Sequence, residues 1–76
     1  MAQLLSPLPG TFYRKPAPGK PNYKEDGDAV AKGDVVGLIE VMKSFNEVKA
    51  DAAGKITFIA ENEDAVMAGQ ALAEIA

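Results

Sequence analysis

The hydrophobic pattern centres on residues 40–44 (EVMKS), which lie between an apolar, strand-like segment, residues 35–39 (VVGLI), and a second β-favouring segment, residues 45–50 (FNEVKA). Before this stretch, Val35 and Ile39 stand at odd positions, whereas Val48 and Ala50 after it stand at even positions. Successive side chains of a strand point to opposite faces, so the apolar face changes between the two segments. One strand over both segments would also exceed the usual length of ~3–10 residues. The pattern therefore predicts two strands joined by a tight turn.

The turn is predicted at Met42 and Lys43, where no Asn-Gly or Asp-Gly pair eases the change of direction. A turn built from unsuitable residues is typical of a segment kept for function. At the tip of such a hairpin, Lys43 would be held in solvent, accessible to a modifying enzyme. Two alternatives stay open, an ordinary exposed lysine and an amphipathic helix, because the apolar spacing over residues 35–45 also fits a helix. Valine and isoleucine content favours the strands.

An internal repeat supports the β interpretation. At a constant offset of 36 positions, Asp28, Ala29, Val30, Gly33 and Ile39 match Asp64, Ala65, Val66, Gly69 and Ile75. Further upstream the offset is 44, because the stretch starting at Gly10 matches the one starting at Gly54. The two offsets differ by eight, so the first half holds about eight extra residues, and the proline-rich segment 14–23 is where they lie. Repeats of this kind indicate two similar structural units.

Two similar β halves predict an all-β domain over residues 1–76, in which neither half buries its apolar face alone. Together they close into a flattened sandwich with pseudo-twofold symmetry. The central hairpin joins the halves, with its tip at one end and the chain termini at the other. Short strands are predicted at residues 11–13 and 55–59, and residues 1–5 form an apolar lead-in. The prolines of residues 14–23 exclude a helix interior and a central strand, so that segment is a stiff loop.

Composition excludes several kinds of function. The 76 residues include no histidine and no cysteine, which removes the usual general base, the thiol nucleophile and most metal ligands. No catalytic constellation and no metal site are predicted. A net charge of −3 argues against binding nucleic acid or an anionic membrane. No signal peptide or spanning segment is visible, so a soluble cytoplasmic protein is expected.

The sequence resembles biotinyl domains, specifically the biotin carboxyl carriers of acetyl-CoA carboxylase. The resemblance rests on residues 40–43 (EVMK), on residues 6–13 (SPLPGTFY) and on residues 45–48 (FNEV), and it covers nearly the whole chain. It implies a barrel-sandwich hybrid of two four-stranded antiparallel sheets. It also implies that Lys43 carries biotin through an amide bond. Val41, Met42 and Ser44 would be the residues beside that cofactor.

The resemblance further implies a carrier that shuttles a carboxyl group without an active site of its own. Its partners would be a biotin protein ligase, a biotin carboxylase and a carboxyltransferase. Tethering raises the effective concentration of the carried group at both enzymes. Carriers of the acetyl-CoA carboxylase type have a protruding "thumb", and residues 15–23 lie where the thumb would be, although a plain surface loop is the alternative.

The sequence departs from the family pattern at Ser44, where Met or Leu is common after the modified lysine. The chain also begins shortly before the pattern, as a minimal carrier or an excised domain would. Three rival interpretations remain: a lipoyl domain, a biotin carrier of another carboxylase such as a pyruvate or other acyl-CoA enzyme, and an unmodified interaction module. A lipoyl domain usually has Asp before the lysine and Ala after it, and Met42 and Ser44 match neither.

Overall fold

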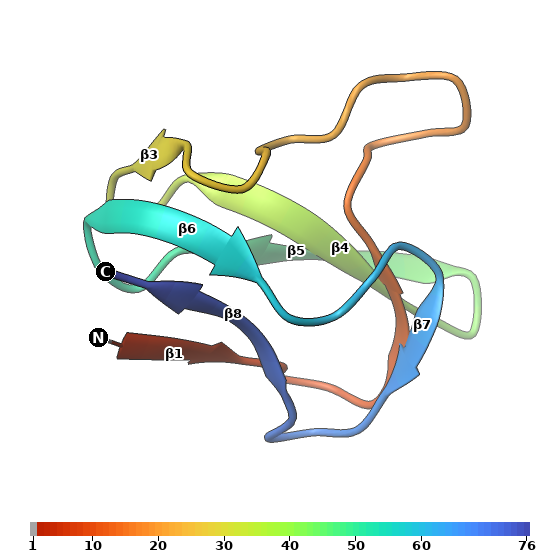
Figure 1. Ribbon diagram of the computed structural model, residues 1–76. Helices are drawn as coiled ribbons and strands as arrows, with labels where there is room; N and C mark the ends of the chain where they lie inside the picture. The colour runs from red at the N-terminus through yellow and green to blue at the C-terminus, as the bar shows by residue number, and fades with distance from the viewer. Residues whose placement is uncertain (1) are drawn as a thin grey trace.

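The computed structural model describes residues 2–76, and every regular element in them is a β-strand. The strands are β1 (Ala2–Leu5), β2 (Gly10–Tyr13), β3 (Ala29–Val30), β4 (Val35–Val41), β5 (Ser44–Lys49), β6 (Gly54–Phe58), β7 (Asp64–Val66) and β8 (Ala71–Ile75). They form two four-stranded antiparallel sheets, in the orders β1-β8-β6-β3 and β5-β4-β2-β7 (Figure 1). The predicted fold class is confirmed, and the helical alternative for the central segment is wrong.

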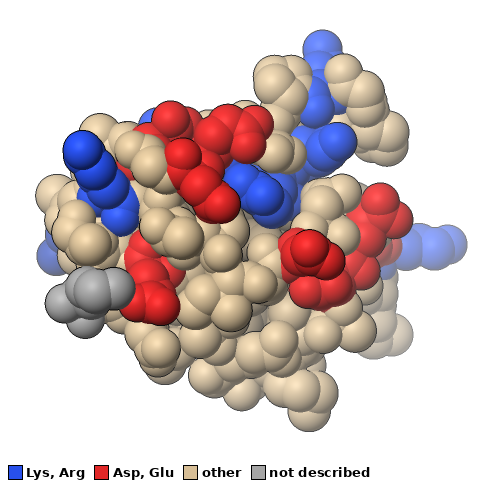
Figure 2. Space-filling view, in the orientation of Figure 1, with Lys and Arg blue, Asp and Glu red and all other residues tan. Residues whose placement is uncertain are grey.

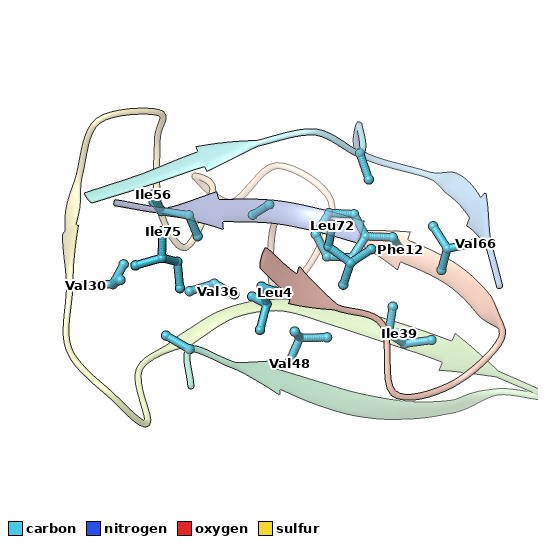
Figure 3. Close-up of a cluster of buried hydrophobic side chains, with 13 residues drawn as sticks. Leu4, Phe12, Val30, Val36, Ile39, Val48, Ile56, Val66, Leu72 and Ile75 are labelled. Atoms are coloured by element: carbon cyan, nitrogen blue, oxygen red, sulfur yellow. The ribbon is translucent and has the colours of Figure 1, made fainter. Parts of the chain in front are cut away.

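The core lies between the two sheets, where the alternating apolar side chains of both layers meet (Figure 3). The largest fully buried side chains are Phe12, Ile39, Ile56, Leu72 and Val36. Full burial of a side chain of this size stabilises the fold by roughly 1.5–3 kcal/mol. The sheets are therefore held together by apolar burial, contributed by both halves of the chain.

The sequence repeat is a structural pseudo-twofold, visible in individual hydrogen bonds. The Gly33 amide donates to the carbonyl of Ala50 at 2.7 Å, and the Gly69 amide donates to the carbonyl of Ser6 at 2.8 Å. The glycines are related by the offset of 36 and their acceptors by the offset of 44. Both glycines have positive φ, 94° and 84°, which an L side chain rarely adopts. The match explains why these two glycines recur.

Two β-bulges obey the same symmetry. The register of β4 against β5 shifts between Val35 and Gly37, which leaves Val36 as the extra residue. The register of β1 against β8 shifts so that Leu72 is the extra residue. Both side chains turn inward and are fully buried. The simple alternation that grouped Val35 with Ile39 is therefore wrong at this point, because the bulge makes Val35 half-buried and Val36 a core residue.

The chain ends and the loops lie as the two halves require. The expectation that residues 1–5 are only an apolar lead-in is wrong, because residues 2–5 form strand β1, which pairs with β8. Met1 lies outside the described residues. Strand β6 covers residues 54–58, one residue earlier than predicted. The β4–β5 turn lies at one end of the molecule and both termini at the other (Figure 1). None of the described residues belongs to a helix long and apolar enough to cross a membrane.

The connection from β2 to β3 (residues 14–28, the β2–β3 loop) is the part of the chain that protrudes furthest from the sheets (Figure 1). It holds no strand, as its prolines predict. The equivalent connection in the second half, from β6 to β7 (residues 59–63), is ten residues shorter. Eight of these are the difference between the two offsets, and the other two arise because β2 ends one residue before the equivalent of the end of β6 and β3 begins one residue after the equivalent of the start of β7.

Candidate functional site: the β4–β5 turn and the adjoining groove

The turn between β4 and β5 consists of two residues. Val41 and Ser44 form the last pair of the ladder, so Met42 and Lys43 alone reverse the chain. Their φ angles are 50° and 67°. Positive φ at both central residues is the signature of a type I′ turn, which matches the twist of the strands but favours Asn and Gly. Side chains larger than these cost about 1 kcal/mol or more each in this conformation.

The side chains at the tip point into solvent. Met42 is 94% exposed, and Lys43 and Ser44 are exposed as well. Among the described residues, Lys43 takes part in no salt bridge, so no carboxylate holds its amine. An amine presented in this way is open to an acyl donor from most directions. The predicted position of Lys43 at a hairpin tip is what the structure shows.

The strands beneath the turn are braced by residues that the sequence analysis did not assign to the site. The Asn46 side-chain amide donates to the carbonyl of Ile39 at 3.3 Å and to that of Ser44 at 3.4 Å, which links the two strands. On the outer face, the Tyr13 hydroxyl donates to a Glu40 carboxylate oxygen at 3.1 Å. The sequence gives no local signal for the Tyr13–Glu40 hydrogen bond, because the two residues are 27 positions apart.

A groove adjoins the turn on the outer face of the second sheet. It encloses about 570 Å³ and is lined by Tyr13, Lys15, Pro16, Ala17, Pro18, Gly19, Leu38, Phe45, Asn62 and Glu63. One wall is therefore the β2–β3 loop and the other the outer face of the sheet. Leu38 forms part of the groove and is only 8% exposed. Because Phe45 is two residues from Lys43, the groove reaches to the base of the turn.

The charges around this region are unevenly spread. Basic side chains are seen on the protruding β2–β3 loop, and acidic side chains gather on the face below it (Figure 2). Within residues 2–76 no group of three or more acidic, histidine or cysteine side chains could hold a metal ion. The region combines the exposed amine of Lys43 at the turn with a groove whose walls are partly apolar and aromatic and also include Lys15.

Comparison with known proteins agrees with this geometry. The model of the family described as "Biotin-requiring enzyme" matches residues 2–75. The chain belongs to this biotin-requiring family. The resemblance seen in the sequence is thereby confirmed at the level of the family.

Among its relatives, the chloroplastic biotin carboxyl carrier protein of acetyl-CoA carboxylase from Glycine max is 52% identical over 64 residues, which are 83% of this chain and 24% of that protein. The protein of the same name from a Nostoc species is 42% identical over 76 residues, 99% of this chain and 42% of that protein. The protein of that name from Chlamydia pneumoniae is 43% identical over 74 residues, which are 96% of this chain and 44% of that protein. The chain spans less than half the length of these relatives.

In this member of the biotin-requiring family, the four residues expected around the cofactor fall into two layers. Met42 and Lys43 form the tip, while Val41 and Ser44 pair directly beneath them. Val41 is partly buried and packs against the core, so it anchors the turn to the domain. Ser44 is exposed, so its hydroxyl adds no contact to the core.

Tyr13 lines the groove and is hydrogen-bonded to Glu40, near the end of strand β4 that leads into the turn. The hydrogen bond to Glu40 raises the pKa of the Tyr13 phenol above its ordinary value of 10.0, and burial and the nearby carboxylates of Glu40 and Glu63 add to the effect. The Tyr13 ring also lies 6.3 Å from the ring of Phe45, measured between centroids. Tyr13 therefore stays a neutral hydrogen-bond donor that fixes Glu40 and supports Phe45.

Proposed function

We propose that this domain is a biotin carboxyl carrier and that Lys43 is its biotin acceptor. The observation that carries the proposal is the two-residue turn, which holds Lys43 exposed at the end of a braced hairpin against the preference of its own residues. The relatives named biotin carboxyl carrier protein of acetyl-CoA carboxylase support the same conclusion. The lysine would be joined to biotin by an amide bond through Nζ.

The residues around the turn fit such a cofactor. The amine is accessible, and the adjoining groove has proline and aromatic walls for the apolar, sulfur-containing half of a neutral fused ring and polar lining residues, Asn62 and Glu63, for its ureido half. Bound biotin would supply a ureido nitrogen that carries a carboxyl group. The protein's own part is to present the tether at a fixed point, which raises the effective concentration of the carried group at each enzyme it visits.

The partners follow from that role. A biotin protein ligase would acylate Lys43, a biotin carboxylase would load the tethered group, and a carboxyltransferase would unload it, in acetyl-CoA carboxylase and so in fatty acid synthesis. Met42 and Ser44, exposed on either side of the amine, are the residues that a ligase would touch. Val41 would position them from below, through its packing on the core.

We also infer that the β2–β3 loop serves as a thumb beside the tethered group. Two observations support this role: residues of the loop form one wall of the groove, and Phe45 in the opposite wall is two residues from Lys43. The cytoplasm is the location expected for such a carrier in a bacterium, while relatives from Glycine max and Arabidopsis thaliana are named chloroplastic.

The experiment that tests the acceptor is ligation in vitro. The protein is incubated with a biotin protein ligase, ATP and biotin, and its intact mass and modified peptide are measured. One biotin should appear, on the peptide containing Lys43, and Lys43→Arg should abolish it while leaving the melting temperature unchanged. Lys20→Arg, in the protruding loop, is the control and should be modified fully. Biotin on another lysine of Lys43→Arg would overturn the assignment.

A further inference from the structure

The eight extra residues of the first half have sharply defined ends. Arg14 is equivalent to Phe58 by the offset of 44, and Tyr23 is equivalent to Ile59 by the offset of 36. Phe58 and Ile59 are consecutive, so the inserted segment is residues 15–22. The Tyr23 amide donates to the carbonyl of Arg14 at 2.8 Å and closes the neck of the insertion. The segment therefore leaves and re-enters the framework at one point.

The Arg14 side chain occupies that point. Its guanidinium carbon lies 4.1 Å from the centroid of the Phe58 ring, a distance at which a cation is attracted to the ring face. One of its terminal nitrogens donates to the carbonyl of Lys24 at 3.3 Å and to a Glu25 carboxylate oxygen at 3.5 Å, and it lies 4.0 Å from Asp26. The side chain is only 19% exposed. It thus connects the chain that leaves the insertion to strand β6.

The two-fold comparison shows that the framework does not depend on this side chain. The Arg14 amide donates to the Asn62 side chain at 2.8 Å, and the Phe58 amide donates to the Asp26 side chain at 2.9 Å, which is the same bond in the other half. In the second half the residue that donates this backbone hydrogen bond is a phenylalanine, so the bond does not need an arginine side chain. The arginine is present only in the half that carries the insertion, next to its first residue.

The arrangement is not the one that stability alone would favour. The Arg14 Nε atom is buried without a hydrogen-bond partner, and an unpaired buried donor costs free energy. A guanidinium is planar and offers several donors in fixed directions, so it sets an angle between the groups it contacts. These properties suit a residue that fixes direction.

We propose that Arg14 is the positioning residue of the inserted segment. Its guanidinium, held on Phe58, sets the angle at which residues 15–22 stand over the sheet and so the width of the groove next to Phe45. Whatever is tethered at Lys43 then meets a wall of fixed position. This last step rests on the proposed function, whereas the positioning of the segment does not.

The first test measures the segment in the unmodified protein. Backbone ¹⁵N order parameters are recorded for Ala17, Gly19 and Lys20 in the wild type and in Arg14→Met, Arg14→Lys and Phe58→Leu. The wild-type values should be near those of a rigid backbone, roughly 0.85, and fall towards about 0.6 in Arg14→Met. Arg14→Lys keeps the charge but not the planar fork, so it should give a partial loss.

The controls separate positioning from general stability. Phe58→Leu, which removes the ring beneath the guanidinium, should reproduce the change in the segment. Lys20→Met removes a positive charge from the same segment and should leave the order parameters of Ala17 and Gly19 unchanged. Unchanged values in Arg14→Met would overturn the proposal, and so would an equal fall throughout strands β4 and β5, because the role would then be structural.

The second test concerns the tethered group. Biotinylated wild type and Arg14→Met are compared as substrates of a purified biotin carboxylase. Their rates of ligation should agree within about twofold, while KM for carboxylation changes severalfold with kcat nearly constant. An equal KM would overturn the effect on the groove. Failure of the wild type to accept biotin at Lys43 would overturn the proposed function and leave the order-parameter result standing.

Discussion

Gly27 and Glu63 hold the same backbone position in the two halves of the domain. Both have positive φ, 90° and 70°. The Gly27 amide donates to the carbonyl of Ile56 at 2.7 Å, and the Glu63 amide donates to the carbonyl of Phe12 at 2.6 Å. Both halves of the fold therefore require a positive φ at this position. In the second half the residue is a glutamate, which disfavours that conformation.

Replacing this glutamate should stabilise the domain. Asn adopts positive φ more readily than Glu, so Glu63→Asn should raise the free energy of unfolding by about 0.5–1 kcal/mol. Glu61→Asn removes the same charge two residues away, at a position without positive φ, and should shift the free energy by less than half as much. Urea denaturation of both variants decides the matter, and equal shifts would mean that charge, not backbone strain, is responsible.

At the β4–β5 turn, relieving the same backbone strain should stabilise the domain but slow ligation of Lys43. Met42→Asn places a residue that favours the left-handed region at φ 50°, so the free energy of unfolding should rise by about 1 kcal/mol. Ligation at Lys43 should slow by roughly tenfold, since the ligase loses an apolar side chain to contact. Met67→Asn, another exposed methionine, should do neither. A more stable Met42→Asn with unchanged ligation would show that the ligase does not read this side chain.

Removing the inserted segment should leave the framework intact. Deleting residues 15–22 joins Arg14 to Tyr23, which reproduces the direct connection of Phe58 to Ile59 in the second half. Loop closure becomes slightly less costly, so the free energy of unfolding should change by no more than ~1–2 kcal/mol. Lys43 should still be biotinylated, while carboxylation of the tethered biotin changes. A thermal melt showing an unfolded variant would mean that the segment is structural.

The Tyr13–Glu40 hydrogen bond makes a contribution to the free energy of unfolding that depends on pH. Because the pKa of Tyr13 is raised in the folded protein, the folded state holds the phenolic proton more tightly than the unfolded chain does. The resulting stability is fully present below pH 10, near the pKa of an unfolded tyrosine, and is lost as the pH rises through the folded pKa. Only two tyrosines are present, so absorbance titration of Tyr23→Phe reports Tyr13 alone. Adding Glu40→Gln should lower its midpoint, and an unmoved midpoint would rule out the carboxylate as the cause.

The sequence by itself determined the features that local pattern encodes. Alternation of apolar residues and a change of face at Met42 and Lys43 indicated two strands and a turn. Two constant offsets indicated the two halves and the size of the insertion. Such signals are readable because the period of side-chain direction depends only on neighbouring residues.

The tertiary structure decided everything that depends on which strands become neighbours. Strand β1 is too short to show a period, and it is a strand because β8 supplies its hydrogen bonds. The inward turn of Val36 follows from a register shift against β5, which alternation along β4 cannot reveal. Arg14 meets Phe58 because the pseudo-twofold brings equivalent positions face to face, although they are far apart in the chain. Contacts between distant residues are fixed by register and packing, and the sequence encodes these only through the fold as a whole.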